Sequence, residues 1–164
     1  MRPLLALAVL ATPLAAADLT HKSDSGSFTA RFPGEPRLDE KDLVIGGGRS
    51  AWVAVHRATD PKSGAEFSVT VAEYPAAFAE VPADTLLDGV RDGLKGKDGK
   101  IMNEERMTGP HPGRAVRIEA GQNTIRTRLV LVGTRLFQVT VIGKTRSFPE
   151  KLSVEFYASF EPKR

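Results

Sequence analysis

The segment TIRTRLVLVGTRLFQVTVIG, residues 124–143, predicts a β-hairpin at the centre of the fold. Two apolar runs flank the pair Gly133-Thr134, and glycine at the first central position is typical of a two-residue type II′ turn, whose twist matches that of the strands. Such a turn also fixes which residues face each other across the hairpin. It pairs Leu131 with Leu136, Val130 with Phe137, and Arg128 with Val139.

Both faces of this hairpin carry apolar side chains. One face has Ile125, Leu129, Leu131, Leu136 and Ile142, and the other has Val130, Phe137, Val139 and Val141. Strands that are apolar on both faces are typical of the centre of a sheet that is covered on both sides. We therefore expect packing layers above and below the hairpin.

The rest of the chain predicts further strands and two helices, separated by Gly- and Pro-rich turns. Strands are expected at residues 27–32, 37–45, 49–58, 67–73, 100–107 and 114–120, with the charged 37–45 segment at a sheet edge. Helices are expected at residues 82–94, with Pro82 at the first helical position, and at residues 148–160. A polar lead-in at 19–26 and a loop at 74–80 complete the pattern.

Each predicted helix has one apolar stripe. The stripes consist of Leu86, Leu87, Val90 and Leu94 in the first helix, and of Leu152, Phe156 and Phe160, with Tyr157 beside them, in the second. Tight turns between consecutive strands leave no room for helical crossovers, so the sheet should be antiparallel. The predicted fold class is α+β, an antiparallel β-sheet flanked by helices.

Residues 1–17 predict a secretory signal peptide. A basic residue precedes an apolar run from Leu4 to Leu14, and three alanines before Asp18 match an A-x-A cleavage signal. The alternative, a membrane anchor, is disfavoured because the run is shorter than the ~20 apolar residues that span a bilayer. Residues 18–164 should then form a single α+β domain without a transmembrane segment, in the periplasm or outside the cell.

The composition narrows the class of protein. With no cysteine, the chain has no lipobox, no disulfide framework and no thiolate for catalysis or metal binding. An exported chain without disulfides favours a bacterial envelope domain over a small animal-type secreted module. The formal charge of +3, which becomes +2 when one arginine leaves with the signal peptide, does not indicate nucleic-acid binding.

Four parts of the sequence form a recognisable pattern: SGSFTARFPGEPR (25–37), which contains F-x-x-x-F-P-x-x-P, LLDGVRDGL (86–94), PGRAVRIE (112–119), and the end from VGTRLFQVTVIG (132–143) to FYASFEP (156–162). In these segments the chain resembles small exported bacterial domains that are abundant in planctomycete-type proteomes. The hairpin pattern G-x-R-L-x-Q-V-x-V, followed by a helix that closes on Ser-Phe, also resembles the wider PsbP/Mog1-like fold.

This resemblance covers nearly all of residues 18–164 and implies a PsbP/Mog1-like sandwich. PsbP proteins of photosynthetic membranes assist a metal-containing complex, and Mog1 proteins bind a small GTPase. The shared motifs are turns, a hairpin and a packed helix, and the functional residues of neither group match positions in this sequence. The resemblance therefore implies the fold, and neither function is carried over.

The serine and histidine residues do not predict a catalytic or metal centre. Asp24-Ser25-Gly26 precedes the first strand and lacks a G-x-S-x-G elbow. His21, His56 and His111 are far apart in the sequence and form no H-x-x-x-H pair. We therefore expect no metal site from these residues.

The acidic pairs and glycine runs are equally uninformative about catalysis. Glu104 and Glu105 should point to opposite faces of a strand, so they cannot act together on one bond. The glycines at 46–48 and 93–99 lack the strand-then-helix context of a phosphate-binding loop and predict turns. We expect no enzyme activity and no cofactor.

The strongest surface signal comes from Arg117, Arg126 and Arg128. The last two share a hairpin face with Val139 and Val141, and Arg117 lies on a neighbouring strand. Clustered guanidinium groups can bind a carboxylate or phosphate. The group is typical of a solvated or ion-paired margin of the sheet, and a ligand-binding site is the alternative that we retain.

Three functions stay open from the sequence. The pattern favours an exported, non-enzymatic binding or accessory domain of the cell envelope, whose partner is an unknown envelope protein. An alternative is a carrier for a small anionic ligand, bound between a helix and the sheet near Arg126 and Arg128. The third is an enzyme built from scattered His, Asp and Ser residues.

Overall fold

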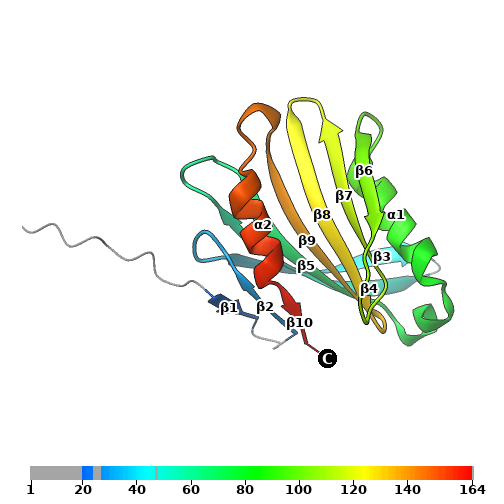
Figure 1. The fold of residues 1–164 in the computed structure, drawn as a ribbon. Helices are drawn as coiled ribbons and strands as arrows, with labels where there is room; N and C mark the ends of the chain where they lie inside the picture. The colour runs from blue at the N-terminus through cyan, green and yellow to red at the C-terminus, as the bar shows by residue number, and fades with distance from the viewer. Residues whose placement is uncertain (1–19, 24–26, 47, 164) are drawn as a thin grey trace, which may run out of the picture.

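The computed structural model describes residues 20–23, 27–46 and 48–163. In these ranges the chain forms two antiparallel sheets, two α-helices and two short 3-10 helices, η1 (Ala76–Glu80) and η2 (Thr145–Ser147) (Figure 1). The first 3-10 helix lies inside the loop predicted at 74–80. The predicted signal peptide and the Asp24-Ser25-Gly26 segment lie outside the described residues.

The larger sheet has seven strands in the order β3-β4-β5-β9-β8-β7-β6 (Figure 1). They are β3 (Arg37–Gly46), β4 (Arg49–Thr59), β5 (Glu66–Glu73), β6 (Lys100–Arg106), β7 (Gly113–Ala120), β8 (Asn123–Val132) and β9 (Arg135–Lys144). All neighbours pair antiparallel, as the tight turns predicted. The strands predicted here are confirmed to within one residue at each end, and the charged β3 lies at an edge as expected.

The β8–β9 hairpin has the predicted register. Leu131 pairs with Leu136, Val130 with Phe137, and Arg128 with Val139. Gly133 has φ +61°, and no other residue type in the described chain has a positive φ. A positive φ at the first central position alone fits a type II′ turn and excludes type I′. The hairpin lies between β5 and β7, inside the sheet.

A smaller sheet has the order β1-β2-β10, with β1 (Thr20–Lys22), β2 (Phe28–Arg31) and β10 (Glu161–Pro162). The central β2 confirms the strand predicted at 27–32. Two strands were not predicted from the sequence: β1, which lies in the expected polar lead-in, and β10, which follows the last helix. Segments of three and two residues are too short to show an alternating pattern, and they are strands because β2 supplies their hydrogen-bond partner.

The two helices are α1 (Ala83–Lys95) and α2 (Glu150–Ser159). Pro82 is the N-cap of α1 with ψ 134°, so its predicted place inside the helix is wrong; proline fixes φ but leaves ψ free to be extended. The predicted helix at 148–160 is shorter because Phe148 and Phe160 have extended ψ values of 129° and 125°. No helix in the described ranges is long and apolar enough to span a membrane.

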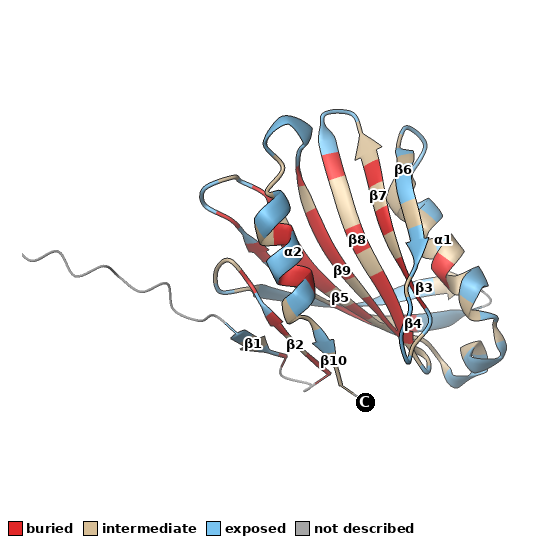
Figure 2. Cartoon of the chain, viewed as in Figure 1, coloured by how far each residue is buried: buried red, intermediate tan, exposed pale blue. Residues whose placement is uncertain are grey.

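The helices lie on opposite faces of the larger sheet, and each covers its own part of the core (Figure 1). On the α2 face the buried residues include Phe28, Phe67, Val69, Phe137, Val139, Val141, Phe156 and Tyr157. On the α1 face they are Leu87, Leu129, Leu131 and Leu136. Figure 2 shows buried positions along the central strands. Cover on both sides of the hairpin, expected from its two apolar faces, is confirmed.

Candidate functional site

Arg117, Arg126 and Arg128 lie together on the face of the larger sheet that carries α2. Arg117 on β7 pairs with Arg126 on β8, and directly paired residues project from the same face. Arg128 lies two residues further along β8 and therefore projects from that face as well. The register thus brings together the three arginines that the sequence singled out, while their role in binding stays a prediction.

Glu150, the first residue of α2, holds two of these arginines. Its Oε1 accepts a hydrogen bond from Arg117 Nη1 at 2.7 Å, and its Oε2 accepts one from Arg126 Nη1 at 2.6 Å. Arg126 Nη1 also donates to Ser153 Oγ at 3.3 Å. The dipole of α2 favours a negative charge at this end of the helix. The arginine pair is therefore held by one intramolecular carboxylate.

Arg128 has a different environment, formed by Tyr157. Its Nη1 donates to the Tyr157 carbonyl oxygen at 3.4 Å, and its Cζ lies 4.9 Å from the centre of the tyrosine ring. In the described part of the chain, no carboxylate forms an ion pair with Arg128. Tyr157 itself is fixed, because its hydroxyl donates to the Arg126 carbonyl oxygen at 2.6 Å. Burial raises the pKa of Tyr157, which keeps this hydroxyl a neutral donor.

These side chains border an open cavity of about 170 Å³. On the side of the edge strand β6, it is lined by Asn103, whose Nδ2 donates to Glu105 Oε1 at 2.9 Å. We call this site the arginine groove and define it by six residues: Asn103, Glu105, Arg117, Arg126, Arg128 and Tyr157. With Glu150, its charged groups are three guanidinium groups and two carboxylates, so the groove keeps a net positive charge that favours an anion.

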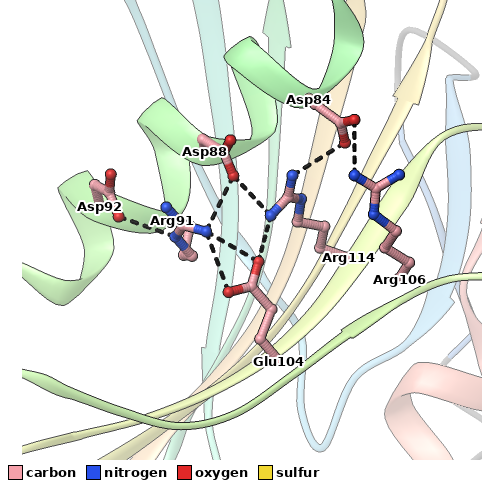
Figure 3. A network of polar contacts seen from close by, with 7 residues as sticks. All are labelled: Asp84, Asp88, Arg91, Asp92, Glu104, Arg106 and Arg114. Atoms are coloured by element: carbon pink, nitrogen blue, oxygen red, sulfur yellow. Dashed lines mark hydrogen bonds and ion pairs between the residues drawn. The ribbon is translucent and has the colours of Figure 1, made fainter.

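The opposite face of the same strands carries a second charged cluster, which joins the sheet to α1 (Figure 3). Its members are Asp84, Asp88, Arg91, Asp92, Glu104, Arg106 and Arg114. Arg114 on β7 is at its centre and forms ion pairs with Asp84 at 3.0 Å, with Asp88 at 2.6 Å and with Glu104. Arg91 of α1 also donates to both oxygens of Glu104, each at 3.1 Å. We call this cluster the α1 network.

Arginine partners lower the pKa of two carboxylates of the α1 network, Glu104 and Asp84, which favours their charged form. Burial acts to raise the pKa of Glu104, but hydrogen bonds from Arg114 and Arg91 outweigh it, so the pKa lies below its usual range. The hydrogen bond from Arg114 likewise lowers the pKa of Asp84. Each of the three arginines thus has at least one carboxylate partner, which indicates that this cluster is a structural link rather than a site for a charged ligand.

The α1 network was not predicted from the sequence, although the sequence contains one signal for it. Arg114 alternates in phase with Val116 and Ile118, which are buried on the α1 face. A charged residue in register with buried ones needs a partner of opposite charge. Asp84 and Asp88 are four residues apart on α1, which places them on one side of that helix. Glu104 and Glu105 do point to opposite faces, as predicted, one in each cluster.

The histidines are closer together than their spacing in the sequence suggested. His21 Nε2 lies 3.0 Å from His56 Nδ1, because β1 pairs with β2 and thereby places His21 against β4. His111 lies elsewhere, beside Met107. Among the described residues, no group of three or more His, Cys, Asp or Glu side chains could hold a metal ion. Of the glycines predicted as turns at 93–99, Gly96 ends α1 as its C-cap with φ +60°, whereas Gly93 lies inside the helix.

No protein-family model matches the sequence, and no curated protein matches it either. Among solved structures, the chain is similar to cyanobacterial PsbP (CyanoP) from Synechocystis sp. PCC 6803, with a TM-score of 0.59 and 12% sequence identity. The match covers 93% of this chain and 96% of that chain. At this identity the similarity shows the fold alone. The protein has a PsbP-like α+β fold, as the sequence predicted, and the resemblance to planctomycete-type domains stays a prediction.

Proposed function

We propose that this protein is an exported, non-enzymatic binding or accessory domain of the cell envelope that docks a carboxylate-bearing partner in the arginine groove. The observation that carries the proposal is the convergence of three guanidinium groups on one open cavity. Guanidinium forks match the geometry of a carboxylate and can bind both of its oxygens. Arg128 is the best placed of the three, since Glu150 already engages the other two.

Export and the lack of catalysis are separate parts of this proposal. Export rests on the signal-peptide pattern of residues 1–17, and N-terminal sequencing of the protein from its native cells should give a chain that starts at Asp18. An uncleaved N-terminus would contradict export. Turnover of an ester, glycoside or phosphate substrate that is lost on a single side-chain change would contradict the non-enzymatic role.

The size of the groove favours a macromolecular partner over the alternative of a small-anion carrier. Sites that enclose a small molecule usually have volumes of about 300–1,000 Å³ and bury most of the ligand surface. The arginine groove has about 170 Å³ and is open to solvent. It is therefore better suited to a side chain presented by a larger partner than to a free ligand that must be enclosed.

A titration with matched peptides tests the proposal. The probes are acetylated hexaglutamate and acetylated hexaglutamine, and the test variant replaces Arg117, Arg126 and Arg128 with glutamine. Arg57→Gln is the control, because Arg57 projects from the opposite face of the sheet. We expect the wild-type protein to bind hexaglutamate but not hexaglutamine. The affinity for hexaglutamate should fall at least about tenfold in the triple variant, because one hydrogen bond between charged groups contributes about 1.5–3 kcal/mol. It should be unchanged in the Arg57→Gln control. If the triple variant and the wild type bound hexaglutamate with equal affinity, the proposal would be wrong.

Glu150 supplies a second variant that does not depend on losing arginines. Its carboxylate competes with a bound anion for Arg117 and Arg126, so Glu150→Gln should tighten hexaglutamate binding. Exposed ion pairs contribute about 0.2–1 kcal/mol each, so release of both arginines predicts a gain of roughly two- to thirtyfold. Glu155→Gln removes the same charge from the same helix and should change affinity little. Identical affinities for the two variants would contradict competition by Glu150.

A further inference from the structure

A second cavity, of about 210 Å³, lies next to the arginine groove. Arg128 and Tyr157 line both cavities and form their shared wall. Beyond this wall the lining becomes apolar, with Met107, Pro110, Val130, Phe160 and Pro162. A third open cavity, of about 260 Å³, is lined by Glu105, Met107 and Arg128 and so shares lining residues with both of the others. The surface is therefore cationic at one end and apolar at the other.

We propose that the segment bound here is an extended peptide of the partner, with an acidic side chain and an apolar side chain two residues apart. This inference rests on the proposed function and specifies its ligand. Arg126, Arg128 and Val130 project from one face of β8 at every second residue, about 7 Å apart. Alternate side chains of an extended peptide have the same spacing. The acidic group then contacts Arg126 and Arg128 while the apolar group enters the cavity beside Val130.

Charge and exposure both favour such a peptide. Arg128 stands between the two cavities and has no carboxylate partner within the described ranges, so a carboxylate placed there gains a partner without displacing one. The apolar cavity is open to solvent, and its volume of about 210 Å³ is below the usual range for sites that enclose a small molecule. A fatty acid bound by its carboxylate would leave most of its chain in water, whereas a peptide would expose its polar backbone.

Fluorescence polarisation with labelled heptapeptides tests the spacing. The peptide Gly-Ser-Asp-Ser-Leu-Ser-Gly has the acidic and apolar residues two positions apart, and Gly-Ser-Asp-Leu-Ser-Ser-Gly has the same composition with them adjacent. A third peptide replaces leucine with serine. We expect the first peptide to bind at least about tenfold more tightly than the other two, because burial of a leucine side chain is worth at least one order of magnitude in affinity. Sodium octanoate should not displace it.

The outcomes separate this inference from the function on which it rests. Equal affinity of the three peptides, still lost when the three arginines are replaced, would overturn the peptide pattern and leave the arginine groove as the binding site. Binding that does not depend on the arginines would overturn both. Displacement by octanoate at concentrations similar to those of the peptide would overturn the choice of a peptide ligand.

A variant of the protein supplies the complementary test. His111 lines the apolar cavity from the loop between β6 and β7 and is half-buried. His111→Trp should fill that cavity and remove the tenfold advantage of the leucine peptide, without changing affinity for the peptide that lacks leucine. An unchanged preference for the leucine peptide in this variant would place its side chain elsewhere and contradict the inference.

Discussion

Replacing Arg114 with methionine should destabilise the protein by separating α1 from β6 and β7. The methionine keeps much of the apolar stem of arginine but removes the guanidinium group, which contacts Asp84, Asp88 and Glu104. Only 9% of the Arg114 side chain is exposed, so the three carboxylates would lose a partner at a buried position.

The size of the stability loss depends on how exposed Arg114 and its three carboxylate partners are. Removing one partner of a fully buried ion pair costs about 3–5 kcal/mol. The exposed fractions of the three carboxylate side chains are 51%, 42% and 24%, so water can compensate in part. We therefore expect the free energy of unfolding to fall by about 2–3 kcal/mol. For a chain of this length, that loss lowers the Tm by roughly 5–10 °C.

Urea unfolding measures this loss, with the fluorescence of the single tryptophan, Trp52, as the probe. Trp52 packs against the core and should report its exposure to water. Arg106→Met is the matched control, because Arg106 pairs with Asp84 alone at 2.9 Å and is 77% exposed. Its loss should cost no more than about 0.5 kcal/mol. The reasoning is refuted if Arg114→Met is no more destabilising than Arg106→Met.

Three further measurements test other parts of the account. Because the folded-state pKa of Glu104 lies below its unfolded value of about 4.3, its contribution to stability is complete above pH 4.3 and is lost as the pH falls through the lowered pKa. Urea unfolding at pH 6.0 and pH 3.5 should therefore show a smaller acid-induced loss in Arg114→Met than in the wild type, and equal losses would argue against the network. Gly89→Ala places a new Cβ in open space on α1 and should stabilise the folded protein by about 0.5–1 kcal/mol. Gly133→Ala, at a position with φ +61°, should destabilise it by about 1 kcal/mol or more. Stability changes of the same sign in the two variants would contradict the backbone conformations described for these glycines. Tyr157→Phe removes a hydrogen bond to a carbonyl of β8 and should lower stability by about 1 kcal/mol, so an unchanged thermal transition would show that this bond contributes nothing.

The central sheet could be predicted from the sequence because its determinants are local. The Gly133-Thr134 turn fixes one register, and the alternation of apolar residues then assigns every side chain of the hairpin to a face. The same alternation placed Arg126 and Arg128 on one face, and the structure adds Arg117 through the register of β7 with β8. Local rules thus give the cationic side of the arginine groove.

The rest of the site depends on contacts between distant segments. Glu150 reaches Arg117 and Arg126 because α2 packs across the sheet, which no local pattern specifies. The position of Tyr157 beside Arg128 has the same origin. The helix boundaries differ from prediction because apolar periodicity continued through Phe148 and Phe160, whose backbones are extended. Periodicity identifies side chains that face the core, whether or not the residue is helical.

The α1 network and the arginine groove lie on opposite faces of β6 and β7. Toward α1, Glu104 and Arg114 bind the helix to the sheet. Toward α2, Glu105 and Arg117 line the arginine groove. Because consecutive residues of a strand alternate between faces, the network that fixes α1 also fixes the strands that form the groove. Variants of the α1 network should therefore be tested for folding before they are tested for binding.

Binding in the arginine groove is tested most directly by an NMR titration that resolves the arginine Nε–Hε signals during addition of the peptide Gly-Ser-Asp-Ser-Leu-Ser-Gly. The arginine groove is predicted to show the largest shifts at Arg126 and Arg128, with smaller ones at Arg117 and saturation at a single site. Arg146, a basic residue near a separate cavity, is the internal control and should not shift. Shifts that are absent, or that centre on Arg146 and leave Arg128 unchanged, would contradict the account.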